Sequence, residues 1–303
     1  MTTMLDHKFI IFYHLAKNPN TTKVAEELYL SQPAISKSIK ELERELAITL
    51  FNREKGRMQL TEAGKYLLTE TESLIQQERK VLFEIGKLRD TFSGTLKIGA
   101  STTLAQYILP ELLSDFTHTN PAIRIQLSSG NTDQIEHEII ANNQHLAFIE
   151  GTPTQPDIRY LPFIKDEIVL VCAPNNPIAE QISIEQLQKL NFVFREKGSG
   201  TYNIIRQQLL HSNIDINQLA HQLILGSTEG IKQYLRYSND CFALLSIYSI
   251  REELATGKLR IIEIDGLTID RTFYAIHRQG ELDPYARQFL DFCSENVGRK
   301  KRK

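Results

Sequence analysis

The feature that most constrains this chain is the segment 21–46, TTKVAEELYLSQPAISKSIKELEREL, in which two short helical patterns meet across a tight turn at residues 29–31. Thr21 or Thr22 is expected to cap the first helix. Ser31 is suited to cap the second, and Pro33 fits its first turn, where a missing N–H costs nothing. Apolar residues at helical spacing predict one buried stripe on the second helix: Ile35, Ile39, Leu42 and Leu46.

The opposite face of the second helix is polar and basic. Gln can pair with adenine edges, Lys can contact guanine or phosphate, and the amides at a helix start favour a phosphate. These groups suit a helix that reads the major groove of DNA. The residues expected to contact DNA in this segment are Thr22, Ser31, Gln32, Pro33, Ala34, Ser36, Lys37 and Lys40. The alternative is an ordinary amphipathic surface helix, which the acidic residues Glu41, Glu43 and Glu45 favour.

A basic hairpin is predicted directly after these helices. The stretch 50–57, LFNREKGR, has Gly56 near its tip and leads into LTEAG at 60–64. Such a wing would lay Arg53, Lys55 and Arg57 against backbone phosphates. Because the formal net charge of the chain is only −2, DNA binding must come from local basic patches of this kind.

These residues resemble the N-terminal domain of the LysR-type transcriptional regulators, and the resemblance is dense across residues 5–64. It rests on SQPAIS at 31–36, Ile39, Leu42, Glu43, Leu46, LF at 50–51, Arg53 and LTEAG at 60–64. Ala47 departs from the family, which usually carries glycine after the recognition helix. The resemblance implies a winged helix-turn-helix over residues 1–60 that binds double-stranded DNA at dyad-symmetric promoter sites. Activation of transcription is the usual outcome in the family, which makes RNA polymerase a further candidate partner.

A long helix is predicted over residues 61–92. A stripe repeats every seven residues along it: Leu67, Leu74, Val81 and Leu88. A thirty-residue helix is about 45 Å long and extends beyond any small core. The stripe favours pairing with the same helix of a second subunit, and the resemblance also implies a linker helix that joins two DNA-binding domains. We therefore expect a homodimer or homotetramer; packing against the chain's own C-terminal domain is the alternative.

From Ser93 onward, strand and helix patterns alternate, which predicts an α/β domain with doubly wound parallel sheets. The expected strands are 95–100, 123–127, 146–149, 167–173, 192–194, 223–225, 242–245, 259–262 and 273–276, and their number favours two sheets. By resemblance, this is a two-lobed, periplasmic-binding-protein-like effector domain with crossover strands between its lobes. It would cover residues 93–297, with lobe I at 93–165 and 269–297, lobe II at 166–268, and a solvated basic tail at 298–303.

Polar residues follow the carboxyl ends of the predicted strands, where ligands bind in doubly wound sheets. Hydroxyls, glycines and free amides there would suit an anion, and Arg195 or Lys197 could add positive charge. The alternative is that each Ser or Thr only caps its own helix. By resemblance, Ser101 and Thr103 are the main contacts. We expect a small anionic or polar effector at Ser101, Thr102, Thr103, Asn131, Thr132, Glu150, Gly151, Arg195, Gly198, Ser199, Gly200, Thr201, Ser227 and Thr228.

Two loops favour a finer hypothesis. EKGSGT at 196–201 and GSTE at 226–229 resemble the CysL-like branch of the family, whose better-known members act on sulfur-assimilation genes. The segment 236–246 departs from the glycine-rich version usual in the family. These loops make control of sulfur-metabolism genes a hypothesis, with a small-molecule co-inducer as the expected ligand.

The same sequence argues against an enzyme, a metal protein or a membrane protein. The eight histidines lack zinc-type spacing, and Ser199 does not lie in a G-x-S-x-G elbow, so no catalytic residue, metal or cofactor is expected. The apolar runs are too short to cross a bilayer, no signal peptide is visible, and Cys172, Cys241 and Cys293 suit reduced buried thiols. We therefore expect a cytoplasmic protein; a cytosolic solute-binding module without a transcriptional role is the alternative.

Overall fold

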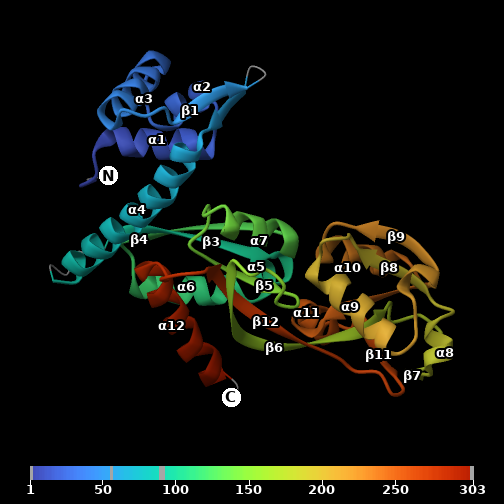
Figure 1. Cartoon of the computed structure of the whole chain (residues 1–303). Coiled ribbons are helices and arrows are strands. Elements are labelled where there is room, and N and C mark those ends of the chain that lie inside the picture. The colour runs from blue at the N-terminus through green and yellow to red at the C-terminus, as the bar shows by residue number, and fades with distance from the viewer. Residues whose placement is uncertain (1–2, 55–56, 89–92, 301–303) are drawn as a thin grey trace. The chain divides into compact units, whose positions relative to one another are not determined.

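A computed structural model describes residues 3–54, 57–88 and 93–300 of the chain. The chain divides into two compact units, Met1–Thr91 and Phe92–Lys303 (Figure 1). In the described residues, no helix is both long enough and apolar enough to cross a bilayer.

The first unit is a winged helix-turn-helix that continues into one long helix. Its elements are α1 (His7–Lys17), α2 (Thr21–Glu27), α3 (Gln32–Leu46), β1 (Phe51–Glu54), β2 (Arg57–Leu60) and α4 (Glu62–Leu88). The predicted inner face of α3 is confirmed for Ile35, Ile39 and Leu42, which are buried against α1 and α2. The antiparallel pairing of β1 with β2 forms the predicted wing.

Two expectations about these helices are wrong. Leu46 is 43% exposed, because α3 ends there and Ala47 turns the chain with a left-handed φ of 52°. The cap of α2 is Asn20 rather than Thr21 or Thr22. The Asn20 side chain can accept hydrogen bonds from two orphan amides at the helix start, those of Thr22 and Lys23, each at 3.1 Å.

The long helix α4 has two different ends. Near its start, Leu67 and Leu68 pack on the helix-turn-helix core, and the ammonium of Lys17 lies 2.5 Å from the carboxylate of Glu72. Farther along, α4 leaves large apolar side chains exposed: Leu74, Val81, Leu82, Ile85 and Leu88. Its 27 residues span about 40 Å. Residues 89–92 of the predicted helix lie outside the described residues.

The second unit is built on a ten-stranded sheet of order β4-β3-β5-β12-β6-β10-β8-β9, with β11 and β7 joined to β6 as a branch. Its strands are β3 (Gly94–Ser101), β4 (Ile123–Gly130), β5 (Leu146–Glu150), β6 (Ile158–Cys172), β7 (Gln181–Ile182), β8 (Asn191–Arg195), β9 (His221–Leu225), β10 (Cys241–Ser246), β11 (Arg260–Ile264) and β12 (Ile269–Arg278). Its helices are α5 (Thr102–Tyr107), α6 (Leu109–Thr119), α7 (Thr132–Ile140), α8 (Ile184–Leu187), α9 (Gly200–His211), α10 (Thr228–Tyr237), α11 (Arg251–Ala255) and α12 (Pro284–Lys300).

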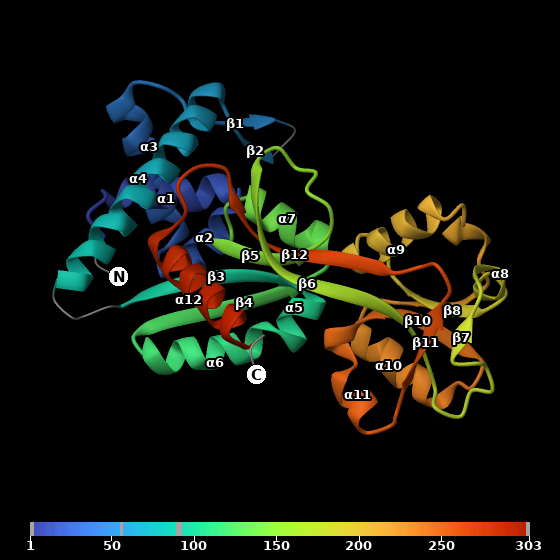
Figure 2. The same cartoon turned by 90° about the horizontal axis from the view of Figure 1, so that it is seen from below.

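Two long antiparallel strands, β6 and β12, join the two halves of this unit, as Figure 2 shows. By their order along the chain within this unit, we call the half with β3, β4, β5 and α5–α7 the proximal lobe, and the half with β7–β11 and α8–α11 the distal lobe. The predicted parallel pairing is confirmed within each lobe, for β3 with β4 and β5 and for β8 with β9 and β10. The two sheets are not separate, however, because β6 pairs antiparallel with β10, β11 and β12 and joins them into one mixed sheet.

The length of β6 was missed by the sequence prediction, which found only residues 167–173. Pro162 lies within the missed part, and proline cannot donate to a strand ladder. The structure accommodates it where the register between β6 and β12 shifts, between Phe273 and Tyr274. The fifteen residues of β6 can span about 50 Å, enough to reach through both lobes.

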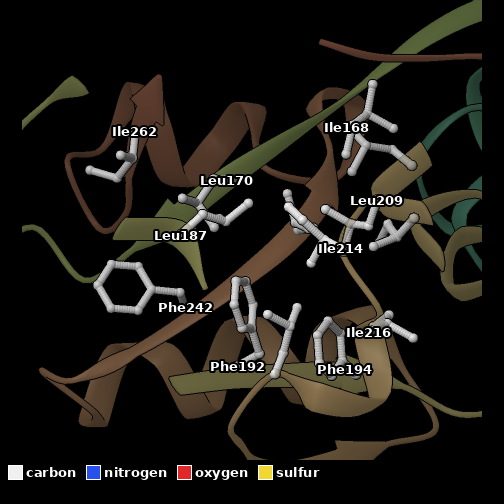
Figure 3. Close-up of a cluster of buried hydrophobic side chains, with 14 of the residues drawn as sticks. Ile168, Leu170, Leu187, Phe192, Phe194, Leu209, Ile214, Ile216, Phe242 and Ile262 are labelled. Atoms are coloured by element: carbon white, nitrogen blue, oxygen red, sulfur yellow. The ribbon is translucent and has the colours of Figure 1, made fainter. Parts of the chain in front are cut away.

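Each lobe has apolar packing of its own. In the distal lobe, Phe192 and Phe194 stack with ring centroids 5.1 Å apart, among aliphatic side chains from β6, α8 and α9 (Figure 3). In the proximal lobe, Ile135 and Ile139 of α7 pack against β5 and β12. Helix α12 reaches back to this lobe, where Phe289 meets Phe116 edge-on at 5.0 Å. Because each lobe has its own apolar packing, polar groups can lie at the boundary between them.

The C-terminal tail and the cysteines bear on two further expectations. Helix α12 runs to Lys300, so the first two residues of the basic run are helical rather than a free tail; residues 301–303 lie outside the described part of the chain. All three cysteines are free and buried. Burial raises the pKa of the Cys172 and Cys293 thiols, which disfavours the reactive thiolate.

Candidate functional site

The outward face of α3 is polar and exposed. Gln32, Ser36, Lys37 and Lys40 all lie on it, opposite the buried stripe. Ser31 caps the helix through a bond from the Ala34 amide. This surface can offer amide, hydroxyl and ammonium groups to the edges of base pairs.

Two of the three acidic residues on α3 contact other elements of the first unit. The Glu43 carboxylate accepts hydrogen bonds from the Leu50 amide at 2.7 Å and the Phe51 amide at 3.2 Å. Glu45 accepts from the Lys8 ammonium at 2.7 Å. Glu43 and Glu45 therefore tie α3 to the start of the wing and to α1, while Glu41 lies 3.9 Å from the ammonium of Lys37 on the basic face.

The predicted DNA contacts outside α3 are partly described. Thr22 is exposed in the first turn of α2, and Gln32 donates from Nε2 to Oγ1 of Thr21 at 2.9 Å. Arg53 and Arg57 lie on the two strands of the wing, but only their backbone is described. Lys55 lies outside the described residues.

Between the two lobes, hydroxyls from separate elements converge on one buried carboxylate. Ser101, at the end of β3, donates to Oε2 of Glu150, the last residue of β5. Thr103 of α5 donates to Oε1 at 3.3 Å, and Thr201 of α9 donates to the same oxygen at 3.1 Å. Glu150 is 1% exposed. The predicted residues thus meet, but around a carboxylate that belongs to the chain.

A buried ion pair stands beside this cluster. Asp166 of β6 and Arg271 of β12 are direct cross-strand partners, and Nε of Arg271 donates to Oδ2 of Asp166 at 2.6 Å. Nη1 of Arg271 also donates to Oγ1 of Thr201 at 2.8 Å and lies 4.0 Å from Glu150. Burial raises the pKa of Asp166, although the charge of Arg271 and bonds from Arg271 and Ser246 act in the opposite direction.

A second group of polar residues surrounds Arg195 at the end of β8. Its Nη1 donates to Oγ1 of Thr102 at 2.9 Å and to Oγ1 of Thr228 at 3.2 Å, so it connects the two lobes. The Glu196 carboxylate accepts from Nε at 2.8 Å. Burial raises the pKa of Glu196, but the bond and charge of Arg195 outweigh it and hold that pKa below its usual range. Arg195 is therefore already paired with an acid.

A tyrosine adds another link between the lobes. Tyr107 of α5 donates from its hydroxyl to Glu229 of α10, and the ammonium of Lys232 lies 4.8 Å from the centroid of its ring. Burial and the Glu229 carboxylate raise the pKa of Tyr107 well above its ordinary value. The phenol therefore remains a donor throughout the physiological pH range.

Several predicted effector residues are helix caps, as the alternative interpretation held. The side chain of Asn131 accepts from the Gln134 amide, that of Ser199 from the Tyr202 amide, and that of Ser227 from the Gly230 amide. Ser101 is different, because it makes no cap bond and donates to Glu150 instead. Capping thus explains part of the predicted set and leaves the Glu150 cluster unexplained.

The glycines of the predicted site serve close packing and turns. A Cβ on Gly200 would overlap the backbone and side chain of Glu150 and the hydroxyl of Thr132, which itself donates to the Glu150 carbonyl at 2.8 Å. Gly198 has a φ of +89° and faces Asn131 and Asp133, while Gly151 turns the chain after β5 with a φ of +140°. The distal lobe therefore rests directly on the proximal lobe at Gly200.

Sequence reasoning missed Arg271, Asp166, Ser246, Tyr107 and Glu229. Arg271 and Asp166 did carry a signal, since each occupies an inward position of an alternating strand, between Ile269 and Phe273 and between Ile164 and Ile168. A charge at such a position needs a buried partner. In the part of the chain that the structure describes, no group of His, Cys, Asp and Glu is arranged to hold a metal ion.

Comparison with known proteins assigns each of the two units to a protein family. Residues 7–65 match the family described as bacterial regulatory helix-turn-helix protein, lysR family, and residues 89–298 match the LysR substrate binding domain. The chain belongs to the LysR family of transcriptional regulators. This confirms the resemblance found in the helix-turn-helix segment.

Relatives within the LysR family span nearly the whole chain. The uncharacterized HTH-type transcriptional regulator YeiE of Escherichia coli K12 is 32% identical over 285 residues, 93% of this chain and 94% of that protein. The HTH-type transcriptional activator CmpR of Synechocystis is 29% identical over 94% of this chain and 93% of its own length. Both relatives are named as regulators of transcription, not as enzymes.

Solved LysR structures show the same architecture. The regulatory domain of Synechocystis CcmR in complex with 2-PG has a TM-score of 0.62 at 30% identity, covering 67% of this chain and 97% of that domain. A full-length OxyR variant from Pseudomonas aeruginosa has a TM-score of 0.70 at 19% identity, covering 97% of this chain and 95% of that one. The fold of this LysR protein is therefore a helix-turn-helix joined to an α/β effector-binding domain.

Proposed function

We propose that this LysR-type regulator binds promoter DNA through α3 and the wing, and that a small anionic or polar effector acts on it through the boundary between the lobes. In this proposal, residues 1–60 bind DNA, residues 61–92 pair two chains, and residues 93–297 bind the effector. Effector binding changes how DNA is bound or bent, and thereby changes transcription.

The observation that carries the effector part is the Glu150 cluster. Hydroxyls of Ser101 and Thr103 from one lobe and of Thr201 from the other donate to one buried carboxylate. Preorganised donors of this kind recognise anions, and a ligand held by both lobes would alter the contact between them. Within the predicted effector contacts we therefore give most weight to this cluster, because Asn131, Ser199 and Ser227 cap helices and Arg195 is paired with Glu196.

The test is a thermal-shift screen of the full chain with small anions. The panel includes sulfate, acetylserine and 2-PG, the last because the CcmR regulatory domain is in complex with it. A responding anion should lose its effect in Ser101→Ala and Thr103→Ala, whose folding is checked by circular dichroism. An unchanged response in both variants would place the effector elsewhere.

The DNA part is supported by the exposed polar face of α3 and by the wing that follows it. Two chains joined through the exposed apolar residues of α4 would present two such faces to a dyad-symmetric site. We include RNA polymerase as a further partner of the DNA-bound protein. Footprinting on the DNA upstream of its own gene should show two protected half-sites; absence of salt-dependent binding would contradict this proposal.

Control of sulfur-metabolism genes is the finer proposal, and its support is the resemblance of the loops 196–201 and 226–229 to the CysL-like branch. Sequencing the DNA fragments that the protein protects across the genome tests it directly. Enrichment of sulfur-assimilation promoters is the expected result, and a set of protected promoters without such genes would refute it.

A further inference from the structure

Arg271 has one donor group that the described residues leave unused. Its Nε and Nη1 donate to Asp166 and Thr201, but Nη2 is buried and has no hydrogen-bond partner within residues 3–54, 57–88 and 93–300. A buried guanidinium N–H without an acceptor is unfavourable, because it has lost its water and gained nothing in return. This N–H marks a place for an acceptor that comes from outside the chain.

The groups that hold Glu150 next to Arg271 suit a free oxyanion equally well. They are the hydroxyls of Ser101, Thr103 and Thr201, with Nη1 of Arg271 at 4.0 Å. Hydroxyls and a guanidinium recognise oxygen atoms that carry negative charge, whichever molecule these belong to. The Glu150 carboxylate therefore occupies a position in which a ligand carboxylate or sulfate could make the same bonds.

Of the two carboxylates in this cluster, Glu150 is held less closely by Arg271. Asp166 lies 2.6 Å from Arg271, whereas Glu150 lies 4.0 Å away, and all three side chains are buried. Two carboxylates that share one guanidinium repel each other. Asp166 has the tight cross-strand bond to Arg271, whereas Glu150 is held by the neutral hydroxyls of the cluster, so Glu150 is the group that can be exchanged.

We propose that the effector is a compact oxyanion that takes the place of the Glu150 carboxylate, and that Arg271 selects for its charge. The incoming anion replaces the negative charge that leaves the cluster with Glu150, and the vacated space is that of the departing carboxylate. This inference rests on the proposed function and deepens it by naming the chemical class of the ligand and the residue that recognises its charge.

The exchange has a mechanical consequence. In this structure Glu150 connects the lobes itself, since it accepts from Ser101 and Thr103 on one side and Thr201 on the other. After the exchange, the ligand makes these bonds and the Glu150 side chain no longer does. The contact between the lobes then depends on the ligand, which gives the effector control over their arrangement.

The experiment is isothermal titration calorimetry of the full chain with sodium acetate and with sodium sulfate, at constant ionic strength set by sodium chloride. Glu150→Gln keeps the size of the side chain and removes its charge. We expect it to bind at least one of the two anions roughly tenfold more tightly than the parent chain, because a competing like charge is gone. Tighter binding of acetate alone indicates a carboxylate effector, and of sulfate alone a sulfate-like one.

Two further variants in the Glu150→Gln background test whether Arg271 and the Thr201 hydroxyl bind the anion. Arg271→Lys keeps a positive charge opposite Asp166 but removes the free Nη2 donor, so it should lose most of the gain in affinity. Thr201→Val, which removes one hydroxyl donor without changing any charge, should also weaken binding. Lys165→Gln is the matched control, because it removes an exposed positive charge from the opposite face of β6 and should change the affinity less than about twofold.

An anion affinity that is unchanged or weaker in Glu150→Gln would overturn the inference. Equal losses in Arg271→Lys and Lys165→Gln would also overturn it, since they indicate general charge attraction. The proposed function has a separate readout, the binding of the parent chain to promoter DNA with and without the responding anion. If the parent chain shows anion-dependent DNA binding but Glu150→Gln binds the anion no more tightly than the parent, the inference is refuted and the proposed function stands.

Discussion

Gly200 lies directly against the backbone carbonyl of Glu150, so closely that no side chain can be added at this position without displacing one lobe from the other. Gly200 begins α9 of the distal lobe, and Glu150 ends β5 of the proximal lobe. The absence of a Cβ at residue 200 therefore permits Thr201 to reach the Glu150 carboxylate.

Substitution of this glycine should separate the lobes. Gly200→Ala is expected to lower the free energy of unfolding of the second unit by about 1–3 kcal/mol, the usual cost of overpacking a close contact. Urea unfolding followed by circular dichroism measures it. Gly226→Ala is the control, since a Cβ there meets nothing within 4 Å. Equal stability of the two variants would contradict the close contact.

Ala47 holds a conformation that costs an L-residue energy. Its φ of 52° lies in the left-handed region, where the Cβ is unfavourable and glycine is not penalised. Ala47→Gly should therefore stabilise the first unit by about 0.5–1 kcal/mol. Ala63→Gly, inside α4, should instead destabilise it by about 1 kcal/mol. Unfolding midpoints of both variants in urea decide whether the backbone conformation is the cause.

Gln32 and Arg53 should affect DNA binding in different ways. Gln32→Ala removes a candidate base contact and should reduce discrimination between cognate and altered sites by about 1–3 kcal/mol. Arg53→Ala should weaken binding to all sequences alike. It should also reduce the slope of log affinity against log salt concentration by about one, because one phosphate contact is lost. Fluorescence anisotropy at several salt concentrations measures both. If Gln32→Ala left discrimination intact, α3 would not be the reading helix.

The exposed apolar face of α4 should be the surface that joins two chains. Val81→Glu places a charge on this face and should shift the protein from dimer or tetramer toward smaller species, because a buried unpaired carboxylate is costly. Gln76→Glu adds the same charge elsewhere on α4, where the side chain is also exposed, and should leave the assembly unchanged. Size-exclusion chromatography with light scattering compares their masses. Equal masses would refute pairing through this face.

The burial of His277 should make the folded protein less stable in acid. Burial lowers its pKa, and the positive charges of Arg287 and Arg159 act in the same direction. Below about pH 6.5 the unfolded chain binds a proton that the folded chain resists, so the free energy of unfolding falls as pH falls. The slope from one such group is at most about 1.4 kcal/mol per pH unit. His277→Gln should therefore lose less stability than the parent between about pH 7.5 and about pH 5.5; parallel curves would exclude His277.

Much of the fold could be predicted because it follows from local spacing. The buried positions of Ile35, Ile39 and Leu42 follow from helical periodicity, and Ser31 was recognisable as a cap. Most strands of the second unit were found in the same way, since each is a short apolar run between turns. The errors at Asn20 and Leu46 concern helix ends, where one residue of difference changes a cap or exposes a side chain.

The sequence by itself determined the family, the helix-turn-helix and the polar residues that follow the strands, because periodicity and motif spacing are local properties. Only the tertiary structure decided that Glu150 receives the hydroxyls expected to bind an effector, and that Arg271 faces Asp166 across two crossover strands. The physical reason is that strand register brings together residues about a hundred positions apart, and no local pattern encodes that register.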